Sequence, residues 1–115
     1  MSNITQRITS NEELKALLKT HETPIYHITI DGTIISNDPI FQRQNNKLKE
    51  VDFQVGEPTP NTESIRLTLW ENDAREYNQS DRIKITNAHI TKWNNSYQLK
   101  AGPYSRIERI QEIKK

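Results

Sequence analysis

Five short segments of the chain alternate apolar and polar residues with a period of two, and this pattern most limits the possible folds. The segments are 26–34, 51–55, 65–70, 82–90 and 97–101. Successive side chains of a strand point to opposite faces, so each segment predicts a strand with one buried face. Hydrophobic residues make up only 32% of the 115 residues, and such strands need few of them. The length suits one small domain.

A helix is predicted before the strands. Ser10 and Glu13 have the spacing of a capping box, and three leucines follow at helical spacing. Pro24 prevents the helix from running on into the first strand. The leucine stripe packs this helix onto the domain, or alternatively offers it to a protein partner.

The connections between the strands narrow the fold class further. Residues 37–47 predict a long polar loop or an extended hairpin tip, and Asn94-Asn95 predicts a tight hairpin turn. Residues 74–76 predict a short helical turn between the third and fourth strands. Five strands with a helix at that point have the element order of an OB-fold barrel. We therefore expect an all-β fold, a five-stranded OB-fold barrel with a short N-terminal helix; a five-stranded SH3-like sheet is the alternative.

We expect three parts along the chain and no catalytic chemistry. The parts are a helical extension over 1–23, the barrel over 24–110 and a tail over 111–115. The absence of cysteine excludes disulfides, thiolate nucleophiles and cysteine-based zinc sites. The three histidines lack metal-ligand spacing, and no phosphate-binding or nucleophile motif occurs. We expect no metal, no cofactor, no membrane span and a cytoplasmic location with the nucleoid.

The third strand gives the first indication of function. Ile65, Leu67 and Leu69 fix its buried face, so Trp70 falls on the outer face with Arg66 and Thr68. The alternative is that a loop or the N-terminal helix covers the Trp70 ring. An accessible tryptophan beside an arginine is typical of a surface that stacks nucleic-acid bases.

The fourth strand has two hydrophobic phases, which predicts a β-bulge near Asn87-Ala88. With that bulge, His89 and Trp93 join the outer face. The expected outer face then carries aromatic rings and cations without a carboxylate; its members are Arg66, Thr68, Trp70, Arg82, Lys84, His89, Trp93, Gln98 and Lys100. The second half of the chain is also basic, since residues 64–115 have 10 − 6 = +4 charges against 6 − 9 = −3 for residues 1–63.

Three stretches resemble the OB-fold of archaeal single-stranded DNA-binding proteins and their eukaryotic relatives near replication protein A. They read IRLTLW (65–70), DRIKITNAH (81–89) and WNNSYQLKAG (93–102). In that family, aromatic residues stack on DNA bases at positions that Trp70, His89 and Trp93 occupy here. His89 departs from the usual tryptophan, which implies weaker, pH-sensitive stacking. The N-terminal helix is outside the family pattern.

We therefore expect sequence-tolerant binding of single-stranded DNA in replication or repair, by a monomer. Trp70, His89 and Trp93 are expected to stack on bases. The expected phosphate contacts are Arg66, Arg82, Lys84, Lys92 and Lys100, with Phe41 and Arg43 clamping the strand from the rim of the long loop. Two alternatives stay open: an OB-fold RNA-binding protein, and a protein-interaction subunit that docks through its aromatic face and N-terminal helix.

Overall fold

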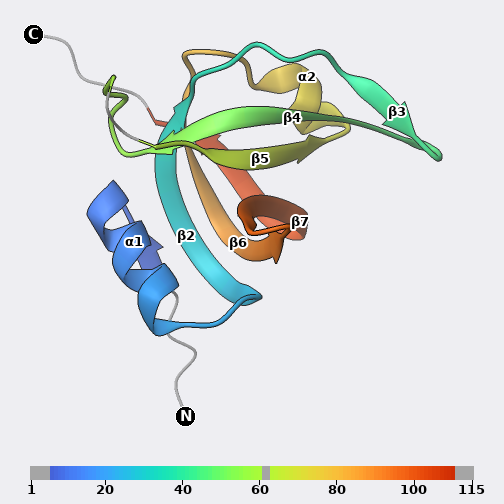
Figure 1. The fold of residues 1–115 in the computed structure, drawn as a ribbon. Helices are drawn as coiled ribbons and strands as arrows, with labels where there is room; N and C mark the ends of the chain where they lie inside the picture. Colours follow the sequence, from blue (N-terminus) through green and yellow to red (C-terminus); the bar gives the residue numbers. More distant parts are fainter. Residues whose placement is uncertain (1–5, 61–62, 111–115) are drawn as a thin grey trace, which may run out of the picture.

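The protein forms a closed barrel of five strands in a computed structural model that describes residues 6–60 and 63–110 (Figure 1). The barrel strands are β2 (Ile25–Ile34), β4 (Asn46–Val55), β5 (Ile65–Trp70), β6 (Arg82–Trp93) and β7 (Ser96–Arg109). Around the barrel, β2 pairs with β4, β4 with β5, β5 with β7, β7 with β6, and β6 with β2. Only the pairing of β5 with β7 within this circuit is parallel. The predicted OB-fold class is confirmed.

Two further strands and two helices complete the described part of the chain. β1 (Gln6–Ile8) adds a parallel edge to β2, which the sequence pattern did not indicate. β3 (Phe41–Arg43) pairs with β4, so the extended hairpin tip is the correct alternative for this connection. α1 (Asn11–Thr20) and α2 (Asn72–Glu76) lie where helices were predicted. The predicted tail over 111–115 and residues 1–5 lie outside the described residues.

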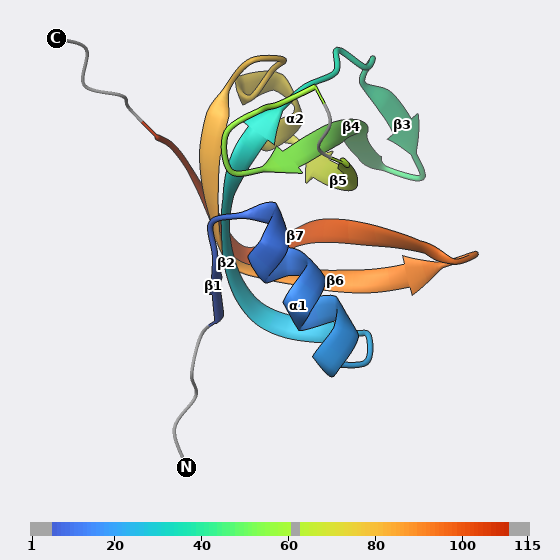
Figure 2. The same ribbon diagram turned by 60° about the vertical axis from the view of Figure 1, so that its left-hand side comes forward.

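The cap of α1 departs from the expected capping box in one bond. Ser10 Oγ accepts from the backbone N–H of Glu13 at 3.2 Å, as predicted. The Glu13 carboxylate, however, accepts from the backbone N–H of Thr9 at 2.8 Å, one residue before the cap. Leu14 and Leu17 are buried in the core, so this stripe packs the helix onto the outside of the barrel beside β1 (Figure 2).

The barrel interior is filled by the apolar phase of each strand. The side chains of Leu67, Leu69, Ile83, Ile85 and Leu99 are all 0% exposed, which confirms the predicted buried faces. The bulge predicted in β6 is also present, because the register with β7 shifts between Thr86 and Ala88. Asn87 there has a φ of 61°, a conformation that asparagine tolerates better than most residues.

The first barrel strand differs from its predicted phase. Tyr26 was expected to share the buried phase of Ile28 and Ile30, but it is 59% exposed, and Ile25 is buried instead. The cause is a second bulge, because the β2–β6 register shifts between Ile25 and Ile28 and His27 has a φ of 63°. One extra residue turns the Tyr26 side chain to the outside.

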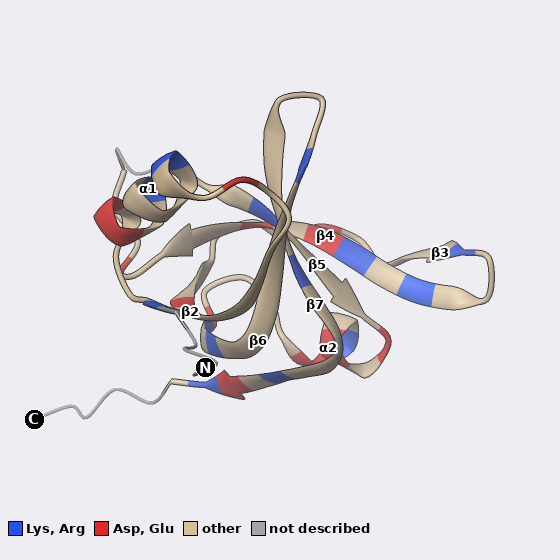
Figure 3. Ribbon diagram, turned by 90° about the horizontal axis from the view of Figure 1, so that it is seen from below, with Lys and Arg blue, Asp and Glu red and all other residues tan. Residues whose placement is uncertain are grey.

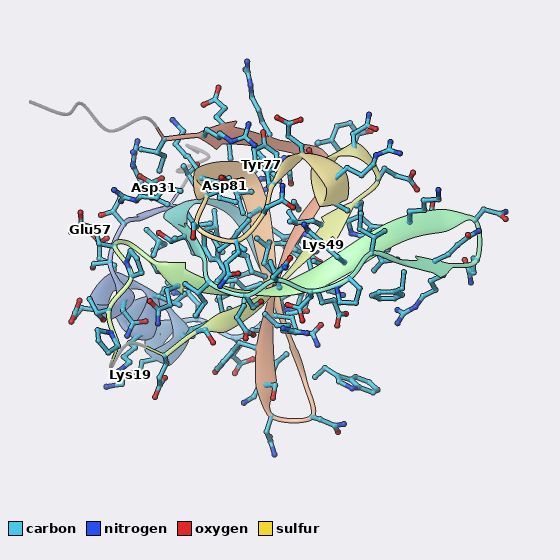
Figure 4. All side chains as sticks on the ribbon, turned by 90° about the horizontal axis from the view of Figure 1, so that it is seen from above. Lys19, Asp31, Lys49, Glu57, Tyr77 and Asp81 are labelled. Atoms are coloured by element: carbon cyan, nitrogen blue, oxygen red, sulfur yellow. The ribbon has the colours of Figure 1, made fainter. Side chains whose placement is uncertain are left out.

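Polar side chains of the connection between β5 and β6 form hydrogen bonds with β4 and β7, and Figure 4 labels two of the residues involved, Lys49 and Tyr77. Lys49 of β4 is buried, and its Nζ donates to Asn78 Oδ1 at 3.2 Å. Burial lowers the pKa of Lys49, although Asp81 and Asp38 act in the opposite direction. The Tyr77 hydroxyl donates to the Ile107 carbonyl at 2.9 Å and links the same connection to β7.

Candidate nucleic-acid interface

Trp70 and Trp93 line one open groove on the outside of the barrel. Trp70 is 36% exposed and Trp93 is 69% exposed, so neither a loop nor α1 covers them. The charged residues that line the groove with these tryptophans are Arg43, Glu50, Lys92 and Lys100. The expectation that both indoles are accessible on one side of the barrel is confirmed.

Strand pairing brings groove residues of β4, β5, β6 and β7 together. Thr68 of β5 lies beside Lys100 of β7, and Gln98 of β7 lies beside Thr91 of β6. Trp70 is the last residue of β5, opposite Leu48 of β4. These neighbours share one face, because directly paired residues in adjacent strands point to the same side of a sheet.

The β6–β7 hairpin carries Trp93 to the rim of the groove. Asn94 and Asn95 have φ values of 50° and 64°, which is the pattern of a type I′ turn. Trp93 is paired with Ser96 on the other side of this turn. Figure 2 shows the hairpin projecting away from the rest of the barrel. The predicted Asn-Asn turn therefore exposes the indole.

The expectation that this face lacks carboxylates is wrong. Glu50 lines the groove itself. Asp52, opposite Arg66 in the β4–β5 pair, accepts from the Arg66 guanidinium at 2.9 Å, and Asp38 lies 3.7 Å from the same guanidinium. β4 contributes Glu50 and Asp52, whereas Asp38 lies between β2 and β3, and Figure 3 shows both signs of charge along β4. The outer face predicted from the sequence includes no residue of β4, and this strand is the source of the difference.

Arg82 and Lys84 were expected on the same face, but the structure does not bring them to the groove. β6 pairs with β7 on both sides of its bulge, and Arg82 and Lys84 lie on the opposite side of that bulge from the groove residues Thr91 and Trp93. Lys84 lies between Asp31 of β2 and Glu108 of β7 in the sheet register. Arg82 lies 3.8 Å from Glu57. Both side chains therefore belong to a part of the barrel with nearby acids.

The two predicted rim residues are both on β3, and only one of them lines the groove. Arg43 lines it together with the two tryptophans. Phe41 is 38% exposed and opens instead onto a neighbouring depression with Lys47 and Glu71. The Arg43 guanidinium carbon lies 5.8 Å from the centre of the Phe41 ring, within the range of a cation–π contact.

His89 lies beyond the groove, in an adjoining depression that shares Trp70 and Lys100 with it. Its ring centre lies 5.7 Å from that of Tyr26, a residue that the sequence reading placed in the core. Burial lowers the pKa of His89, and the positive charge of Lys100 lowers it further. Glu71 and Asp73 also line this depression.

We expect binding of an anionic strand to depend on pH through His89. A phosphate beside the imidazole favours its charged form and raises its pKa in the complex, so affinity rises as pH falls toward the lowered pKa of His89 in the free protein, below the ordinary histidine value of about 6.5. From about pH 7.5 to 5.5, affinity for oligo-dT is expected to increase by about 3-fold. His89→Gln should remove this increase, whereas His21→Gln should keep it, because His21, the C-cap of α1, lines neither the groove nor the depression that holds His89. A full increase in the His89→Gln variant would contradict a phosphate at this position.

We also searched the described residues for a metal site and for a membrane-spanning helix. Within 6–60 and 63–110, no group of three or more His, Asp or Glu side chains is arranged to hold a metal ion. None of the helices in those ranges is long and apolar enough to cross a membrane.

Comparison with known proteins supports the fold. The chain is similar to the OB domain of Ta0387 from Thermoplasma acidophilum, with a TM-score of 0.58 and 18% identity over 85% of this chain and 88% of that one. It is also similar to the replication factor A-related protein from Methanobacterium thermoautotrophicum, with a TM-score of 0.55 and 16% identity over 95% and 96%. No protein-family model and no curated protein matches by sequence. The chain is thus an OB-fold protein by structure.

Proposed function

We propose that the protein binds single-stranded DNA with little sequence preference, by stacking bases on Trp70 and Trp93 and contacting phosphates with neighbouring cations. The observation that carries this proposal is the pair of accessible indoles in one open groove with Arg43, Lys92 and Lys100. Every base has a π-face, so stacking is tolerant of sequence, and cations between the rings can follow the backbone.

The position of the groove on the fold supports the same proposal. In OB-folds, oligonucleotides bind over the second and third barrel strands, between the loop after the first strand and the turn between the fourth and fifth. Here those parts are β4 and β5, the segment that contains β3, and the Asn94-Asn95 turn. One structural neighbour is described as related to a replication factor. A role in protecting or presenting single strands during replication and repair is consistent with this.

Salt dependence separates phosphate binding from docking of a protein. Three groove cations on phosphates predict that log K falls with log salt with a slope near −2, at about −0.7 per phosphate. Replacing Lys92 and Lys100 together with glutamine should flatten the slope by about 1.4, because both contacts are lost. Tryptophan fluorescence during titration with oligo-dT at several salt concentrations measures the slope.

Two control variants make this test specific. Lys15→Gln removes a positive charge from the exposed face of α1, at a residue that lines neither the groove nor its adjoining depressions, and should leave the slope unchanged. Lys84→Gln should also have little effect, because Asp31 and Glu108 flank Lys84 in the sheet. A slope that the Lys92/Lys100 variant leaves unaltered would mean that the phosphates follow another path.

A further inference from the structure

A second aromatic cluster lies on the far side of His89 from the tryptophan groove. Tyr26 is 59% exposed and Tyr104 is 87% exposed. Both line a shallow depression with His27, Asn87 and His89. The side chains that line it include no carboxylate, in contrast to the groove, which contains Glu50.

This cluster is continuous with the tryptophan groove. Trp70 and Lys100 line both the groove and the adjoining depression, and His89 lines both that depression and the tyrosine depression. A strand that leaves Trp93 therefore meets Trp70, then His89, then Tyr26 along one uninterrupted surface. We call this surface the aromatic track: Trp93, Trp70, His89, Tyr26 and Tyr104.

The backbone is distorted on both sides of the cluster in a way that presents Tyr26. His27 and Asn87 both have left-handed φ values, 63° and 61°, and they face each other across the β2–β6 pair. Such a conformation costs about 1–3 kcal/mol for a residue other than glycine, and it is concentrated at functional sites. Without the bulge at His27, Tyr26 would share the buried phase of Ile28. The bulge therefore places the Tyr26 ring on the aromatic track.

Asn87 also holds the other side of the cluster. Its Nδ2 donates to the Tyr104 carbonyl at 3.4 Å, which leaves Oδ1 to accept from His27 Nδ1 at 3.0 Å. Ser105 Oγ donates to the Asn87 carbonyl at 2.6 Å and accepts from the Gly102 N–H at 2.8 Å. Ala101 of β7 pairs with Ala88 of β6, and Arg106 of β7 pairs with Thr86 of β6. Residues 102–105 of β7 therefore lie opposite Asn87 alone, and they form a corner that carries Tyr104.

We propose that Tyr26 and Tyr104 form a second base-stacking subsite, which extends the single-strand path beyond His89. This inference rests on the proposed function and lengthens its site. Tyr26 packs one side of its ring near His89 at a tilt of 31°, within the ordinary geometry of aromatic pairs, and remains largely exposed for a base.

Oligonucleotide length distinguishes this subsite from the tryptophan groove. A short oligo-dT of about 4 nucleotides can occupy only part of the track, whereas one of about 12 can cover it. Replacing both tyrosines with alanine should weaken binding of the long oligonucleotide by about 30-fold or more, because each lost stack accounts for at least about 5-fold, and should leave binding of the short one within about 2-fold. The matched variant with phenylalanine at both positions should retain wild-type affinity for both, because it keeps the rings.

The outcomes separate this inference from the proposed function. Saturable binding of the short oligonucleotide to the wild-type protein supports the tryptophan groove, whatever the tyrosine variants do. Equal affinity of the wild-type and alanine variants for the long oligonucleotide would overturn the tyrosine subsite alone. If the alanine variant does not fold, ring resonances of Tyr26 and Tyr104 in the wild-type protein provide the test. They should shift with the long oligonucleotide and not with the short one; unshifted resonances with both would overturn the subsite.

Discussion

Replacing Trp93 with alanine is expected to weaken binding of oligo-dT by about 1–3 kcal/mol, which is roughly 5- to 150-fold. The loss reflects one base–indole stack at the rim of the groove. The ring is 69% exposed at the tip of the β6–β7 hairpin, so its removal should change the free energy of unfolding little. Fluorescence of Trp70 or competition with a labelled oligonucleotide measures affinity, and thermal unfolding measures stability.

Two further variants at Trp93 separate stacking from simple burial. Trp93→Phe should recover most of the lost affinity, because a smaller ring still offers a π-face to a base. Trp93→Leu should not, although it restores apolar bulk. A surface that docks a protein rewards buried area more than aromaticity and would tolerate leucine. Equal oligo-dT affinities for the phenylalanine and leucine variants, with unchanged thermal stability, would therefore count against base stacking at this position.

Gly32→Ala is expected to destabilise the barrel by about 3 kcal/mol. Gly32 lies where β2 pairs with β4 on one side and β6 on the other, so it is at the closure of the barrel. An added Cβ would lie 2.3 Å from the Gln54 carbonyl oxygen and 2.5 Å from Cζ of the Phe53 ring. Backbone and a fully buried ring cannot move aside at low cost. Thermal unfolding should show a decrease in Tm of more than about 10 °C.

Gly102→Ala is the matched control for that variant. A Cβ at Gly102 would lie 3.9 Å from the nearest heavy atom, which is an ordinary contact. The same change of residue should therefore leave the Tm of the barrel within about 2 °C. A Gly32→Ala variant that unfolds at the same temperature as the Gly102→Ala variant would contradict the close approach of β2 to Phe53.

Much of the fold could be predicted because its signals are local. Strict alternation identified the five barrel strands, and a change of phase between Ile85 and Ala88 located the bulge of β6. Asn94 and Asn95 indicated a turn because asparagine tolerates positive φ. The positions of Trp70 and Trp93 in the groove follow directly from these three local features.

The rest of the candidate site depends on pairing and curvature, which a single segment does not encode. The alternation of β4 already puts Glu50 and Asp52 on its outer face, but only the pairing with β5 brings Glu50 beside Thr68 in the groove. Lys84 pairs with Glu108 beyond the bulge of β6, whereas Trp93 pairs with Ser96 at the hairpin turn, so a shared phase does not bring the two side chains together. The bulge at His27 has neither glycine nor asparagine to signal it. The adjacent residues Ile25 and Tyr26, either of which could be buried, were the indication of this bulge in the sequence.

Titration of the intrinsic tryptophan fluorescence with oligo-dT, duplex DNA and oligo-rU of equal length tests the central claim most directly. Trp70 and Trp93 are the two tryptophans of the chain, and both line the groove, so stacked bases should quench the signal. We predict saturable quenching by oligo-dT and much weaker binding of the duplex, whose bases are unavailable for stacking. Tighter binding of oligo-rU than of oligo-dT would favour an RNA-binding role for the same groove. A folded protein whose fluorescence oligo-dT leaves unchanged, or which binds duplex as tightly, would contradict single-strand binding.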